Sequence, residues 1–113
     1  MATTQTETQI HETVLTPRVD LFENESEFLL EADLPGVKRE DVSLSLQDGQ
    51  LTLEGVRSFN EEEQTRTVFR RSFKFRPLLD EEKIEARLEK GVLHLHLPKS
   101  PEVQPRQIEI QTV

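Results

Sequence analysis

The sequence predicts an all-β protein with an immunoglobulin-like sandwich of two sheets. Short runs of residues alternate between apolar and polar side chains, which is the period of a strand with one buried face. Glycine, proline, asparagine and aspartate separate these runs at short intervals, as turns between strands require. No segment has a convincing helical period. About six to eight short strands joined by such turns favour a sandwich.

The expected strands follow one another along most of the chain. Pro35-Gly36 and Asp48-Gly49 are turn signals, and Asp-Gly between alternating runs is typical of a two-residue hairpin. A charged loop at 57–66 contains an acidic run that we interpret as solvated surface. Strands are expected at residues 19–21, 28–32, 42–46, 51–53, 67–75, 84–88 and 93–97.

The last two strands form a hairpin. Ala86 and Leu88 place apolar groups on one face, and Lys90-Gly91 then interrupts the alternation. Gly91 can take the positive φ that a short hairpin loop needs. Leucines at 93, 95 and 97 restore the apolar face until Pro98 ends the strand. Taken alone, this pattern predicts that the apolar side chains of the hairpin belong to the hydrophobic core.

Composition limits the classes of protein to which the chain can belong. One domain is expected, because 113 residues can bury a single core. The net charge of −8 would repel a nucleic-acid backbone. Cysteine is absent, which fits a reducing compartment and excludes thiolate chemistry, and no apolar run reaches the length of a signal peptide or a membrane span. We expect a cytoplasmic protein without a nucleic-acid partner or a membrane span.

The hairpin sequence A-R-L-E-K-G-V-L-H-L-H-L-P-K resembles the signature of the α-crystallin domain of small heat-shock proteins. Three further stretches are similar to the same family in the same order: P-R-V-D-L-F-E-N-E, D-L-P-G-V-K-R-E-D-V and the I-E-I motif near the C-terminus. The resemblance extends from about residue 17 to residue 110. It implies an α-crystallin sandwich at 17–99, a flexible N-terminal arm at 1–16 and a C-terminal tail at 100–113.

Two features concern assembly and client capture. Family arms help to capture clients, whereas the arm here is short and polar, so a frayed terminus is an equal alternative. Many bacterial and plant members carry a strand in the loop that matches 57–66 and exchange it within a dimer. This loop is too short for that insertion, and we expect a dimer without strand exchange, formed through the edge of the strand at 67–75.

Arg71 shares one face of its strand with Phe69, Phe73 and Phe75. A guanidinium among aromatic rings needs a carboxylate or carbonyl partner if it is buried. Arg71 matches the family's recurrent arginine in F-x-R-x-F, which implies a place at the dimer interface. The alternative is an edge arginine that reaches water.

Ile108 and Ile110 lie on one side of an extended segment that follows a proline-punctuated stretch. One interpretation is a last strand of the chain's own sheet, and the other is a latch that docks on a neighbouring subunit by strand-edge addition. The resemblance implies a groove between the strands matching 42–46 and 93–97. Its expected residues are Val42, Leu44, Leu46, Leu93, Leu95 and Leu97.

No constellation predicts catalysis or a cofactor. His94 and His96 share one face of a strand and could form half of a metal site. A solvated strand face is the favoured interpretation, because the remaining histidine, His11, lies in the arm. No nucleophile has a histidine partner, no carboxylate pair stands out and no glycine-rich phosphate loop is present. We expect no catalytic residue, no metal and no cofactor.

The resemblance implies an ATP-independent chaperone, a holdase that binds partly unfolded client proteins and prevents their aggregation. It also implies self-association into dimers and larger homo-oligomers through the tail. The alternative is a co-chaperone or scaffold module on the same sandwich without holdase activity, which the short polar arm favours.

Overall fold

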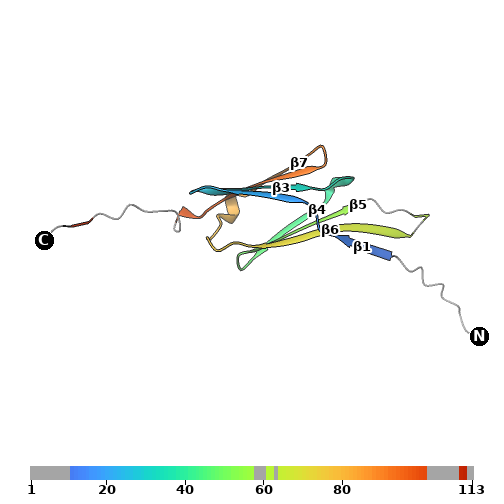
Figure 1. The fold of residues 1–113 in the computed structure, drawn as a ribbon, viewed down its shortest axis with the longest axis horizontal. Coiled ribbons are helices and arrows are strands. Elements are labelled where there is room, and N and C mark those ends of the chain that lie inside the picture. The colour runs from blue at the N-terminus through green and yellow to red at the C-terminus, as the bar shows by residue number, and fades with distance from the viewer. Residues whose placement is uncertain (1–10, 58–60, 63, 102–109, 112–113) are drawn as a thin grey trace, which may run out of the picture.

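The structure is a computed structural model that describes residues 11–57, 61–62, 64–101 and 110–111. The chain folds into two four-stranded sheets. Figure 1 shows the sheets as two layers. In one sheet the strand order is β1 (His11–Leu15), β6 (Thr65–Lys74), β5 (Gln50–Arg57) and β4 (Val37–Gln47). In the other it is β2 (Val19–Glu23), β3 (Glu27–Asp33), β8 (Val92–Pro98) and β7 (Glu85–Glu89), and a short 3-10 turn, η1 (Glu81–Lys83), precedes β7. The predicted all-β sandwich is confirmed.

The core lies between the sheets and follows the alternation in the sequence. Along β3, Phe28, Leu30 and Ala32 are buried while their neighbours are exposed, and β8 repeats the pattern. The strand period of two puts every second side chain on the inner face, where burial of apolar area stabilises the fold. The buried cluster consists of Phe28, Leu30, Ala32, Leu34, Val37, Leu51, Leu53, Phe69, Phe75, Leu79, Leu93, Leu95 and Leu97.

Tight hairpins join β4 to β5 and β7 to β8. Asp48 and Gly49 have φ values of 50° and 78°, and Lys90 and Gly91 have the same pair. Two consecutive residues with positive φ are the requirement of the type I′ loop, whose twist matches that of the flanking strands. A Cβ on Gly49 would lie 2.9 Å from the Phe75 carbonyl oxygen, so this position also lacks space for any side chain.

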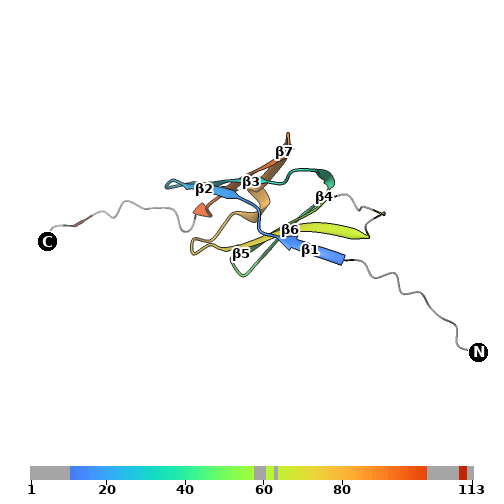
Figure 2. The same ribbon diagram turned by 45° about the vertical axis from the view of Figure 1, so that its right-hand side comes forward.

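The structure differs from the expected arm in that residues 11–15 form β1, a parallel partner of β6. All five residues of β1 are exposed, so backbone hydrogen bonds to an open sheet edge, rather than burial, hold the strand. Figure 2 shows β1 beside β6. β1 therefore occupies the edge of β6 from Thr65 to Phe69, part of the edge expected to pair within a dimer. The rest of the expected arm, 1–10, lies outside the described residues.

The connection between β5 and β6 is short. β5 ends at Arg57, β6 begins at Thr65, and the described residues of the connection include a turn at Glu61 and Glu62 but no strand. Across the part of the chain that the structure describes, no helix has the length and apolar character to cross a membrane.

Candidate functional site

A groove opens where the free edges of the two sheets face each other. β4 is the last strand of one sheet and β7 the last of the other. Between them lies a hollow of about 480 Å³. Free edges carry unpaired backbone N–H and C=O groups, which an added extended segment can use. The hollow is lined by Arg39, Val42, Leu44, Ala86, Arg87, Leu88 and Leu93.

The expected groove residues fall into two groups. Val42, Leu44 and Leu93 line the hollow. Leu95 and Leu97 are 2% and 0% exposed and belong to the core. Leu46 packs against the core as a half-buried residue and does not line the hollow.

Sequence reasoning missed part of the second wall of the groove. β7 supplies Ala86 and Leu88, whereas β8 is paired on both sides, with β3 and with β7. The alternation of Ala86 and Leu88 was visible in the sequence. β7 is the edge strand because the other side of β8 pairs with β3, which is distant in the sequence. The sequence of the β7–β8 hairpin does not indicate this pairing. Two arginines, Arg39 and Arg87, also line this groove, and Arg87 lies 3.5 Å from Glu89.

Arg71 lies near the opposite edges of the sheets and is half-buried. Its Nη1 donates a hydrogen bond to the Pro17 carbonyl oxygen at 3.3 Å, and its guanidinium lies 4.9 Å from the centre of the Phe73 ring. The carbonyl partner that burial demands is thus supplied by the chain itself, at the segment that enters β2. A second hollow of about 470 Å³ lies near this side, lined by residues that include Leu21, Phe28, Phe73, Phe75 and Pro77.

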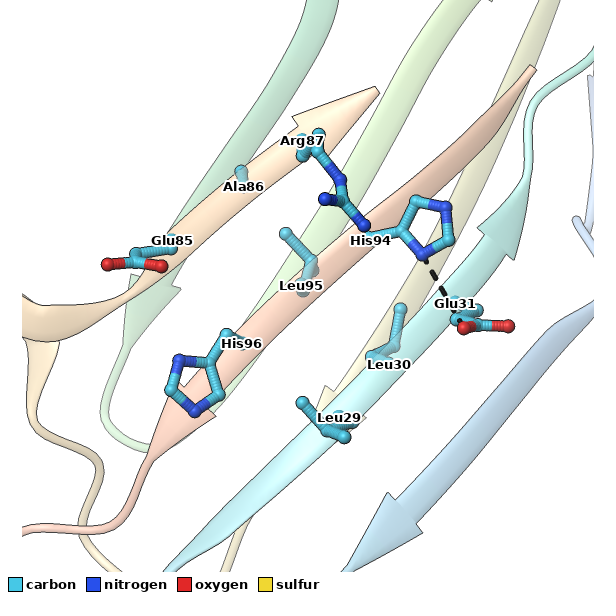
Figure 3. Close-up of a pocket in the computed structure, with 9 residues that line it drawn as sticks. All are labelled: Leu29, Leu30, Glu31, Glu85, Ala86, Arg87, His94, Leu95 and His96. Carbon is cyan, nitrogen blue, oxygen red and sulfur yellow. Dashed lines mark ion pairs between the residues drawn. The ribbon is translucent and has the colours of Figure 1, made fainter. Parts of the chain in front are cut away.

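His94 and His96 lie on the outer face of their sheet, beside carboxylates of β3. His94 Nδ1 is 3.5 Å from Glu31 Oε1, and His96 Nε2 forms a short hydrogen bond with Glu27. Figure 3 shows the two histidines along β8, on either side of Leu95, with the Glu31 contact of His94 drawn. Among the described residues, no group of three potential ligands gathers in a geometry that could hold a metal ion.

The hydrogen bond with His96 is the main reason why the pKa of the Glu27 carboxyl lies below its ordinary value; the charge of His96 and a contact with Asn24 add to the effect, and desolvation opposes it. A lowered pKa in the folded state contributes stability above the unfolded pKa, and this contribution disappears as pH falls through the folded pKa. Because glutamate ordinarily titrates near pH 4.3, the loss belongs to the acid limb, below about pH 4.5.

We therefore expect Glu27→Gln to flatten the fall of unfolding free energy below about pH 4.5, measured by urea melts. Glu25→Gln removes an exposed carboxylate from the same turn and is the control, which should keep the parental slope. Equal slopes for parent and Glu27→Gln would contradict the assignment.

Lys99 is a second residue that sequence reasoning missed. It is 8% exposed, and its Nζ donates to Glu23 Oε2 at 2.8 Å and to the Asn24 carbonyl oxygen at 2.7 Å. Nζ also lies 5.0 Å from the centre of the Phe28 ring. A buried ammonium is tolerated only with such partners. Lys99 therefore fixes the end of β8, from which the tail continues, to the β2–β3 turn.

Of the two isoleucines expected to form the latch, the structure describes only Ile110. Ile110 is described and is 88% exposed, so its side chain does not belong to the core of the sandwich. Ile108 lies outside the described residues.

Comparison with known proteins places this sandwich in a family. The Hsp20/alpha crystallin family matches residues 20–111. Small heat shock protein C2 of Rickettsia felis is 30% identical over 106 residues, which cover 86% of this chain and 69% of that protein. Heat shock protein 16.0 from Schizosaccharomyces pombe superposes with a TM-score of 0.69 at 29% identity, over 88% of this chain and 97% of that one. For a small heat-shock protein from Xylella fastidiosa the TM-score is 0.67 at 31% identity, over 87% and 98% of the two chains. The motifs, the sandwich and these matches agree: the chain belongs to the Hsp20/alpha crystallin family, whose role is that of a chaperone.

Proposed function

We propose that the chain is an ATP-independent holdase that binds partly unfolded proteins and keeps them from aggregating. The observation that carries the proposal is the apolar groove between two free strand edges, a form of surface that accepts an extended apolar segment. Apolar side chains are also exposed outside the groove, and those on the outer face of the β2-β3-β8-β7 sheet are available to a client. The exposed ones are Val14, Leu15, Leu21, Phe22, Leu29, Leu78 and Ile110.

A light-scattering assay tests the proposal. We expect stoichiometric or smaller amounts of the protein to suppress the thermal aggregation of a test client, with the same result with and without ATP. No suppression at any ratio would reject the holdase and favour a scaffold module on the same fold. Suppression that requires ATP would reject the ATP-independent mechanism.

The tail is proposed as the latch that builds the assembly. An extended Q-I-E-I-Q segment presents isoleucines on one side and Glu109 on the other, which complements a groove lined by apolar side chains and by Arg39. Two buried isoleucines contribute about 3–6 kcal/mol before ordering costs of ~1–2 kcal/mol per backbone residue. A single contact is therefore weak and reversible, and multivalency stabilises the assembly. From Pro101 to Ile108 the chain can span about 23 Å, enough to reach a neighbouring subunit.

We expect Ile108→Ala with Ile110→Ala to shift the solution mass toward dimers and to leave the melting temperature unchanged, because Ile110 adds nothing to the core. Gln107→Ala with Gln111→Ala alters the alternate positions of the same segment and is the matched control. Native mass spectrometry measures the mass of the assembly, and a thermal melt measures the melting temperature. Retention of the parental mass by the isoleucine variant would refute the latch, and a collapsed melt would make the segment part of the sandwich.

A further inference from the structure

The outer face of the β2-β3-β8-β7 sheet carries an apolar pair that the groove does not use. Phe22 on β2 and Leu29 on β3 are directly opposite in the strand register and are 57% and 43% exposed. The register continues this row to His96 and then to Glu85. A hollow of about 660 Å³ lies next to the pair, with Leu29 on its border. Figure 3 shows Leu29 and His96 side by side, with Glu85 beyond His96 on β7.

The charged groups on this outer face are predominantly acidic. In the neighbouring row of the strand register, Asp20 lies opposite Glu31, Glu31 opposite His94, and His94 opposite Arg87. Arg87 is also 3.5 Å from Glu89, so a carboxylate partly neutralises it. The other basic side chains in these strands or in the described residues beside them are those of Arg18, Lys90 and Lys99 and the two histidines; Lys99 is paired with Glu23, and His94 and His96 lie beside Glu31 and Glu27. The outward-facing carboxylates are those of Asp20, Glu27, Glu31, Asp33, Glu85 and Glu89.

Neither the same face of a second copy nor residues 1–10 and 102–113 are complementary to this surface. A second copy of the face would bring like charges together, which disfavours face-to-face association. Residues 1–10 contain no lysine or arginine, and residues 102–113 contain Arg106 against Glu102 and Glu109. A cationic segment of another protein that carries an apolar residue offsets the carboxylates and covers Phe22 and Leu29.

We propose that the outer face binds cationic segments of client proteins in which an aromatic or aliphatic residue is flanked by lysine or arginine. The apolar residue packs on Phe22 and Leu29, and the flanking cations pair with the carboxylates around them. Exposed ion pairs add little affinity and much salt dependence, so the apolar pair supplies the anchor and the carboxylates select the client. This inference rests on the proposed holdase function and specifies its client class.

Fluorescence anisotropy of labelled peptides tests the surface directly on the full chain. The probe alternates lysine with phenylalanine and leucine; one comparison peptide replaces lysine with glutamate, and another replaces the apolar residues with serine. We expect the cationic apolar probe to bind at least tenfold more tightly than either comparison, and to weaken as salt rises from 50 to 500 mM. Equal affinity for the three peptides would overturn the proposal.

Matched variants place the binding on this face. Phe22→Ser with Leu29→Ser should weaken the probe at least tenfold, whereas Val14→Ser with Leu15→Ser, an equally exposed apolar pair on β1, should change it less than twofold. Asp20→Asn with Glu31→Gln should reduce the salt dependence, and Glu81→Gln with Glu82→Gln, exposed carboxylates in η1, should not. Thermal melts confirm folding of each variant. Equal losses for test and control pairs would overturn the assignment to the outer face.

Two aggregation-prone clients of similar length and opposite net charge separate this inference from the holdase proposal. Suppression of the basic client at a lower chaperone ratio, lost in the Phe22 and Leu29 double variant, supports the inference. Equal suppression of both clients, unaffected by the variant, overturns the inference and leaves the holdase intact. Suppression of neither client rejects the holdase, and the peptide titration still decides whether the face binds cations.

Discussion

Leu95→Ala is expected to lower the free energy of unfolding by about 2–5 kcal/mol, because it removes a large apolar side chain and leaves a cavity in a packed core. Leu95 is 2% exposed and lies on the inner face of β8, between the paired strands β3 and β7. Urea melts measure the loss. A cost below about 1 kcal/mol would contradict a core position.

Ala86→Glu is the matched variant, since Ala86 is the cross-strand partner of Leu95 yet is exposed and lines the groove. We expect a stability change within about 0.5 kcal/mol, as is usual for surface positions. A bulky carboxylate in the groove should nevertheless hinder the tail and shift the solution mass toward dimers. Parental mass for Ala86→Glu would contradict the groove as the receptor of the tail.

Arg71→Gly is expected to cost about 2–4 kcal/mol, the second large effect. The variant loses a charged hydrogen bond to the Pro17 carbonyl oxygen and the contact with the Phe73 ring, and places a glycine in a strand. Because Pro17 leads into β2, whose outer edge is free, we also expect a broadened distribution of assembly masses.

Arg70→Gly is the control for the same strand. Arg70 points outward and pairs with Glu54 at 3.0 Å, an exposed ion pair worth about 0–1 kcal/mol. It introduces the same glycine penalty, so the difference between the two variants isolates the contacts of Arg71. Equal melting and equal mass for the two variants would show that Arg71 is only an edge residue.

Local patterns were sufficient to predict most of the sandwich. The alternation around Leu30 and Leu95 identifies which face of each strand is buried, and Asp48-Gly49 and Lys90-Gly91 mark hairpins whose positive φ values the structure contains. A period of two is a property of each strand by itself, so it can be read without knowing the partners.

The remaining features depend on pairing between distant segments. β1 has no buried residue, so its backbone pairing with β6 leaves no hydrophobic pattern in the sequence. Leu93 and Leu97 look equivalent in the sequence of the hairpin. Of the two, only Leu93 borders the groove, because the position of β4 determines which residues of β8 line it. Lys99 resembles any surface lysine until Glu23 and Asn24 are brought next to it by the fold.

The anchorage of Lys99 also determines how the sandwich would respond to mechanical load. The Lys99 N–H donates to the Ser26 carbonyl oxygen, and the Ser100 N–H to that of Leu78. A force applied to the tail, as through the proposed latch, reaches these hydrogen bonds and the Lys99 ammonium before it reaches the backbone hydrogen bonds of β8. Force is therefore shared with the β2–β3 turn and the segment before η1, and the central strand of the core is shielded from peeling. If the proposed latch forms, a neighbouring subunit can pull on the tail while the hydrophobic core of the sandwich stays closed.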